Sequence, residues 1–262
     1  MRRPVLAAAA AAAVVLLAGC ASAEPAASPS PTATASAEPA LEGDLVIFAA
    51  ASLTAAFDDI AAAFEDEHPD VDVQPIRYDG SSTLATQIIE GAAVDVFASA
   101  DENNMTKVTD AGLASAAELF ATNTLVVAVP AGNPAGIDDL EGLAGATVVL
   151  CAPEVPCGAA SQRLLEAAGV AVTPASLEQN VTAVLTKVQA DEADAGLVYA
   201  TDVIGKDDVE SFVPEGAADV VNRYPLVALD DAPNPEAADA FVAFVLSPAG
   251  QEILASYGFG AP

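Results

Sequence analysis

Three short stretches place small and hydroxyl-bearing residues where helices are expected to begin: 50–54 (AASLT), 80–84 (GSSTL) and 155–159 (VPCGA). None of them contains Lys or Arg. The first turn of a helix has unpaired backbone N–H groups and a partial positive charge, so it binds anions without cationic side chains. Several such helix starts in one cleft would form a site for a small, fully ionised oxyanion. Ser52 and Ser81 are the candidates; alternatively, each only caps its helix, which is worth about 1 kcal/mol.

Patterns typical of enzymes are weak. The chain has one His, His68, in a polar run that looks like the end of a surface helix, and it has no Gly-x-Ser-x-Gly motif. Zinc-type Cys/His clusters, nucleotide-binding glycine loops and calcium-loop spacing of the acidic pairs are also absent from the sequence. We therefore expect a binding protein rather than an enzyme. An extracytoplasmic hydrolase that uses a pair of carboxylates is the alternative left open.

The first residues have the pattern of an export signal. A basic start precedes an apolar run from Val5 to Ala18 that is too short to span a bilayer, which indicates a secretory signal peptide over residues 1–19. The run ends in Leu-Ala-Gly-Cys, which resembles the lipobox of bacterial lipoproteins, so we expect Cys20 to be lipidated. Ordinary cleavage beside an unrelated Cys is the alternative. Residues 20–43 are rich in Ala, Ser and Pro and predict a disordered linker. The predicted location is the outer face of the cell membrane.

The formal net charge of −30 argues against nucleic acid and anionic membrane surfaces as partners. It does not argue against a small anion, because charges are screened over about 8–10 Å and local donors decide the affinity. Two further cysteines, Cys151 and Cys157, are separated by five residues. Outside the cell we favour a disulfide between them, with two buried thiols as the alternative.

The hydrophobic pattern predicts alternating strands and helices. An apolar strand at 45–49 is followed by a helix with apolar residues at helical spacing as far as Phe64, then by a strand at 71–76, a helix that begins at 80–82 and a strand at 94–98. Repeated strand–helix units indicate an α/β fold with a parallel sheet.

A second series begins with the strand at 123–129, and two helices at 235–246 and 248–257 end the chain. We predict two α/β lobes joined by two crossings, near 124–128 and 224–228. Lobe 1 would comprise 44–125 and 228–262, and lobe 2 would comprise 126–227.

At this point the chain resembles the substrate-binding proteins of bacterial molybdate ABC transporters, the ModA family. The resemblance covers 44–262 in order, through 46–54 (VIFAAASLT), 80–85 (GSSTLA), 93–101 (AVDVFASAD), 153–158 (PEVPCG), 180–181 (NV), 196–202 (GLVYATD) and 257–259 (YGF). It implies a periplasmic-binding-protein fold of type II that closes on molybdate or tungstate and delivers it to a permease driven by an ATPase. Sulfate or phosphate is the alternative ligand. We expect a monomer with no cofactor and no bare metal cation, since molybdenum would be held as the oxyanion.

The same resemblance implies a ligand set. Ser52 and Ser81 would supply hydroxyl and backbone N–H groups, Cys157 and Val181 a backbone N–H each, and Tyr199 a hydroxyl. The family commonly has a small residue such as Ala at the position of Cys157, but a backbone contact tolerates that change. A pocket lined only by donors would also reject hydrogen phosphate, whose proton needs an acceptor.

Overall fold

The computed structural model describes residues 41–262. The expected signal peptide, Cys20 and nearly all of the expected linker lie outside this range. The predicted end of the linker at residue 43 is wrong. Gly43 already belongs to strand β1 (Gly43–Leu45), which pairs in parallel with β3 (Val71–Val73) and so starts the folded part of the chain.

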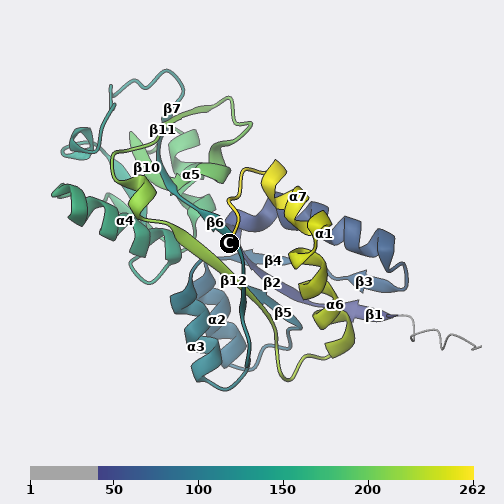
Figure 1. The fold of residues 1–262 in the computed structure, drawn as a ribbon. Helices are drawn as coiled ribbons and strands as arrows, with labels where there is room; N and C mark the ends of the chain where they lie inside the picture. Colours follow the sequence, from purple (N-terminus) through teal and green to yellow (C-terminus); the bar gives the residue numbers. More distant parts are fainter. Residues whose placement is uncertain (1–40) are drawn as a thin grey trace, which may run out of the picture. The chain divides into compact units, whose positions relative to one another are not determined.

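The first lobe is built on a five-stranded sheet in the order β4-β2-β5-β12-β6 (Figure 1). Its strands are β4 (Arg77–Asp79), β2 (Ile47–Ala50), β5 (Val96–Ala98), β12 (Asn222–Ala228) and β6 (Glu118–Asn123). Strand β2 runs parallel to β4 and β5, as the strand–helix pattern predicts, whereas β12 is antiparallel to both of its neighbours.

Helices cover both faces of this sheet. One face packs against α1 (Thr54–Glu67), α6 (Pro235–Leu246) and α7 (Pro248–Ser256), around a cluster of aromatic rings. Within this cluster, the ring centroids of Phe64 and Phe241 are 5.3 Å apart. The other face packs against α2 (Ser81–Ile89) and α3 (Glu102–Asp110).

The second lobe has its own five-stranded sheet, in the order β11-β7-β10-β8-β9. Its strands are β11 (Val209–Phe212), β7 (Leu125–Pro130), β10 (Ala195–Tyr199), β8 (Val148–Cys151) and β9 (Ser176–Glu178). Helices α4 (Pro156–Ala168) and α5 (Val181–Gln189) pack on this sheet through a continuous apolar core.

Two crossings connect the lobes. The first is Thr124, between β6 and β7, close to the predicted position. The predicted second crossing at 224–228, and with it the end of lobe 2 at 227, is wrong. All of β12 pairs with β5 and β6 in the first sheet, and Tyr224 is fully buried there, so the chain returns between Phe212 and Asn222. An apolar strand does not itself reveal which of two sheets it joins.

The predicted two-lobed α/β fold is therefore confirmed. Within residues 41–262, no single helix is long and apolar enough to cross a bilayer. Only α6 and α7 taken together meet that criterion by length and composition, and they bend by 61° at the break between them.

Candidate functional site

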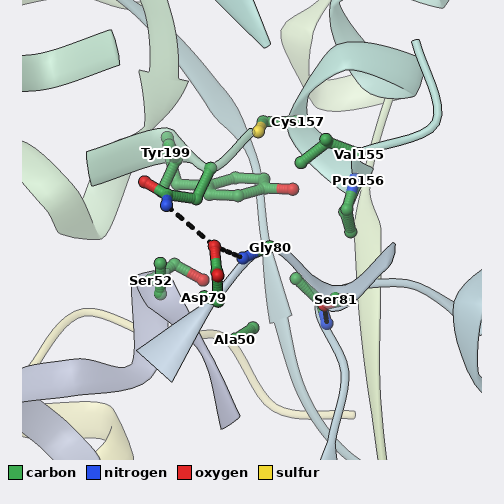
Figure 2. Close-up of a pocket in the computed structure, with 13 residues that line it drawn as sticks. Ala50, Ser52, Asp79, Gly80, Ser81, Val155, Pro156, Cys157 and Tyr199 are labelled. Atoms are coloured by element: carbon green, nitrogen blue, oxygen red, sulfur yellow. Dashed lines mark hydrogen bonds between the residues drawn. The ribbon is translucent and has the colours of Figure 1, made fainter. Parts of the chain in front are cut away.

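A small pocket lies between the two lobes (Figure 2). All five residues expected to bind the ligand line it. The complete lining is Ala50, Ala51, Ser52, Asp79, Gly80, Ser81 and Ala100 from the first lobe, and Val155, Pro156, Cys157, Asn180, Val181 and Tyr199 from the second. No Lys or Arg is among these described residues.

Three helices begin at the pocket. Ser81 is the first residue of α2, Pro156 and Cys157 open α4, and Val181 is the first residue of α5. First-turn N–H groups have no partner within their own helix, so these three helix starts direct free donors and positive dipole ends at one point. Since Pro has no N–H, the first donor of α4 is that of Cys157.

The two serines do not act as helix caps. The N-cap residue of α1 is Leu53 and that of α2 is Gly80, and neither helix has a side-chain cap. Ser81 is 1% exposed, and its Oγ accepts a hydrogen bond from the backbone N–H of Ala100 at 3.0 Å. The alternative that these serines only cap helices is therefore wrong, and the hydroxyl proton of Ser81 remains free to be donated.

Ser52 lies in a 3-10 turn, Ala51–Leu53, just before α1. Its Oγ is 3.0 Å from the hydroxyl oxygen of Tyr224, and either group can be the donor. This contact turns the Ser52 side chain toward the junction of the two lobes, where the return strand β12 begins.

Tyr199 lies at the end of β10 and is 1% exposed. Its hydroxyl oxygen accepts a hydrogen bond from Asn222 Nδ2 at 2.9 Å. Burial raises the pKa of this hydroxyl well above its usual value, with smaller contributions from Tyr224 and nearby carboxyl groups. Tyr199 is therefore neutral and keeps its proton. Its backbone N–H donates to Asp202, and burial raises the pKa of that carboxyl to about 7.

Cys151 and Cys157 form a disulfide, the pairing favoured from the sequence. Cys151 ends β8 and Cys157 is the second residue of α4, so the bridge ties the start of α4 to the sheet. Gly158 packs so closely against the backbone of Ala152 that a Cβ on Gly158 would lie 1.9 Å from the Ala152 carbonyl oxygen. The loop between the cysteines is thus held in one compact shape beside the pocket.

Asp79 also lines the pocket, although the sequence did not point to it. It is the last residue of β4, and its Oδ1 accepts hydrogen bonds from the Gly80 N–H at 2.7 Å and from Asn180 Nδ2 at 2.9 Å. Figure 2 shows its carboxylate in the pocket with both bonds dashed. The hypothesis of a lining made only of donors is therefore wrong. The sequence shows an Asp directly before the Gly-Ser-Ser stretch, but it does not show that this side chain points into the pocket.

The contacts around Asp79 and Gly80 join the lobes. Asn180 belongs to the second lobe, where its Oδ1 also caps α5 by accepting from the Ala183 N–H at 2.9 Å. Gly80 meets the backbone of Gln179 so closely that a Cβ on Gly80 would lie 2.0 Å from the Gln179 carbonyl oxygen. The structure thus has its lobes closed over the pocket.

The pocket has the features of an anion site: neutral hydroxyl and amide donors, helix starts and no cation. No group of three or more His, Cys, Asp or Glu side chains suited to a metal ion occurs within residues 41–262.

Comparison with known proteins agrees with this geometry. The family model for bacterial extracellular solute-binding proteins matches residues 45–260. The molybdate-binding protein ModA of Mycobacterium tuberculosis is 44% identical over 252 residues, which cover 94% of this chain and 93% of that protein. The chain belongs to the ModA family of bacterial extracellular solute-binding proteins. Its relatives are therefore binding proteins rather than enzymes.

Solved structures place this solute-binding protein in the type II periplasmic-binding-protein fold, as predicted. The periplasmic molybdate-binding protein of Azotobacter vinelandii matches with a TM-score of 0.72 and 20% identity, over 83% of this chain and 99% of that one. The sulfate-binding protein SubI of Mycobacterium tuberculosis matches with a TM-score of 0.74 and 17% identity, over 83% of this chain and 86% of that one. The fold alone therefore does not distinguish between oxyanions.

Proposed function

We propose that this solute-binding protein captures molybdate, and also tungstate, in the pocket between its lobes and delivers it to an ABC importer. The observation that carries the proposal is the meeting of three helix starts and two neutral hydroxyl groups, Ser81 and Tyr199, in a pocket without Lys or Arg. The 44% identity to a molybdate-binding protein supports molybdate as the ligand. The protein has no catalytic role in this proposal and works as a monomer without a cofactor.

Neutral donors can supply the necessary affinity. A hydrogen bond to a charged acceptor contributes roughly 1.5–3 kcal/mol. Ser52, Ser81, Cys157, Val181 and Tyr199 together would offset the cost of association and lobe closure and leave micromolar or tighter binding. A closed set of donors also measures size, because a smaller oxyanion such as sulfate would leave some donors unpaired, which costs more than the missing contact.

Thermal unfolding of the purified protein with molybdate, tungstate, sulfate and phosphate tests the proposal. Mass action predicts about 2.7 kcal/mol of stabilisation at a ligand concentration one hundred times the dissociation constant. We expect this response to molybdate and tungstate at concentrations where sulfate has little effect. An equal response to sulfate and molybdate would refute the selectivity.

Hydrogen phosphate is a second candidate ligand, because Asp79 brings a hydrogen-bond acceptor to the pocket wall. If phosphate is the ligand, its proton bonds to this carboxylate, and D79A should abolish phosphate binding. If molybdate is the ligand, D79A should still bind molybdate, which has no proton to donate, and should bind it more weakly only through loss of the Asp79–Asn180 bond that joins the lobes.

We also propose lipidation at Cys20, which would tether the protein to the outer face of the cell membrane. Mass spectrometry of the mature N-terminus should find a lipid-modified Cys20 as the first residue. The C20A variant should be released from the membrane fraction, and a wild-type protein that starts at another residue would refute the tether.

A further inference from the structure

Asn222 has an unusual set of contacts beside the pocket. It is the first residue of β12, in the first lobe, and is 2% exposed. Its Nδ2 donates hydrogen bonds to the Ala100 carbonyl oxygen and to the Tyr199 hydroxyl oxygen, each at 2.9 Å. Its Oδ1 is buried and has no hydrogen-bond partner among residues 41–262. Buried polar atoms are nearly always paired, so this unpaired oxygen calls for an explanation.

The Ala100 carbonyl explains the orientation of the amide. A carbonyl oxygen can only accept, so the nitrogen of Asn222 must face Ala100. The same nitrogen then faces Tyr199. Turning the amide over would place its oxygen against the Ala100 carbonyl, and two buried acceptors in contact cost more than the one left unpaired. Asn222 therefore acts as a donor to Tyr199 and leaves its own oxygen without a partner.

This orientation decides what the Tyr199 hydroxyl can do. Its oxygen accepts from Asn222, so its single proton points elsewhere. The hydroxyl oxygen of Tyr224 is one nearby acceptor, because it can share a hydrogen bond with Ser52 Oγ and still accept a second one from Tyr199. Tyr199 also lines the pocket, so a bound oxyanion, which carries a full charge, is the stronger acceptor for this proton.

The backbone of Ala100 orients both Ser81 and Asn222 through hydrogen bonds. Its N–H donates to Ser81 Oγ at 3.0 Å, which leaves the Ser81 proton free, and its carbonyl holds Asn222. Asn222 belongs to the first lobe and Tyr199 to the second, so their hydrogen bond joins the two lobes in this closed structure.

We propose that Asn222 is a positioning residue that makes the Tyr199 hydroxyl a hydrogen-bond donor to the bound oxyanion when the lobes close. The inference rests on the proposed function, since it requires an oxyanion in this pocket. It adds that the side-chain amide of Asn222, which does not line the pocket, determines which way the Tyr199 hydroxyl donates its proton.

A double-mutant cycle with molybdate as the probe separates this role from a structural one. Titration calorimetry would compare wild type, Y199F, N222A and the double variant. Y199F should weaken binding about tenfold or more, because it removes one hydrogen bond to a charged acceptor. N222A should weaken binding about fivefold or more in wild type but less than about twofold in Y199F, since Asn222 acts through the Tyr199 hydroxyl.

The matched control is N104A. Asn104 is also a buried asparagine that reaches the other lobe, with its Nδ2 3.4 Å from the Glu154 carbonyl oxygen. Its effect should be the same with and without Y199F. An N222A effect that is also independent of Y199F, or wild-type affinity in N222A, would overturn the inference.

N222D and infrared spectroscopy give two further readouts. N222D keeps the size of the side chain but replaces the donor with acceptors, so Tyr199 would give its proton to the new carboxylate. It should bind molybdate more weakly than N222A, and equal or stronger binding would contradict the proposal. In wild type, molybdate should shift the C–O stretching band of Tyr199, assigned by subtracting Y199F, in the direction of a newly donated hydrogen bond. An unshifted band would overturn the inference even if the Asn222 variants do not fold.

The wild-type titration tests the proposed function separately. Binding of molybdate by wild type without coupling in the cycle would refute only the role of Asn222. If wild type binds a different oxyanion, the molybdate proposal fails, and the same cycle with that anion tests Asn222. If wild type binds no oxyanion, both ideas fail.

Discussion

The substitution G80A should weaken ligand binding without disturbing the fold of either lobe. Gly80 has φ −60° and ψ 134°, which alanine adopts readily. In the closed structure, however, the new Cβ would lie 2.0 Å from the Gln179 carbonyl oxygen in the other lobe. The substitution therefore acts on the closed state and leaves an open state unhindered.

The size of the effect follows from the contacts beside Gly80. Cβ atoms essentially never come within 3.0 Å of another atom, so the lobes of G80A would have to separate by about 1 Å at this point. This movement would break the bond between Asp79 Oδ1 and Asn180 Nδ2, which is 2.9 Å long. A hydrogen bond to a charged group contributes about 1.5–3 kcal/mol, so the affinity should fall roughly 10- to 150-fold.

Titration calorimetry with molybdate measures the affinity, and urea unfolding without ligand measures the stability. G142A is the matched control, because the nearest atoms to a Cβ on Gly142 are Ile137 Cγ2 at 3.3 Å and Asp139 Oδ1 at 3.4 Å, both within the second lobe. G158A is the opposite case, since its clash with Ala152 lies inside that lobe and should lower the stability of the unliganded protein. Binding by G80A within about threefold of wild type would refute the view that this closed arrangement is the ligand-bound one.

Four further outcomes follow from the same site. S52A and S81A should each weaken molybdate binding about tenfold or more in calorimetry, and wild-type affinity in both would show that neither hydroxyl contacts the ligand. Removing the disulfide by C151A with C157A should lower the free energy of unfolding by about 2 kcal/mol in urea, as the chain-entropy model predicts for so short a loop; an unchanged midpoint and slope would contradict it. Burial raises the pKa of Asp202 to about 7, so the folded state holds a proton that the unfolded chain loses above pH about 4. The free energy of unfolding should therefore fall between pH about 4 and 7, and D202N should flatten this part of the profile. Finally, with a net charge of −30, the association rate measured by tyrosine fluorescence should rise with salt while the dissociation rate stays nearly constant; association that slows with salt would indicate a cationic approach to the pocket.

Elements with a strong apolar period were predictable from the sequence. The helix α1 buries Phe57, Ile60 and Phe64 at helical spacing and ends at Glu67, next to His68 in the polar run that was expected to end a surface helix. By contrast, α3 has little apolar surface, and one of its three buried residues is Asn104, so its pattern does not stand out. The edge strand β9 has no buried residue at all, and nothing in its sequence distinguishes it from a loop.

The candidate site also has a part that the sequence predicted and a part that it did not. The five expected ligand residues meet at one pocket because helix starts and the end of a buried strand are local features that a sequence pattern reveals. Asp79, Asn180 and Asn222 were missed because their roles depend on distant partners. Asp79 and Asn180 are 101 positions apart, and Asn222 and Ala100 are 122 apart. Polar residues at the ends of strands and helices look like caps until the lobes are brought together.

Asp79 changes how the charge of the site should be understood. An anion pocket in a protein of net charge −30 would gain from a cation, yet its lining adds a carboxylate instead. This carboxylate is itself held by neutral donors, the Gly80 N–H and Asn180 Nδ2. Its hydrogen bond to Asn180 links the lobes, so part of the stability of the closed state comes from a fixed anion of the protein rather than from the ligand. The charge of Asp79 repels every free anion, so binding depends on how completely the neutral donors surround the bound anion. A site arranged in this way selects its ligand by fit and protonation state rather than by overall charge.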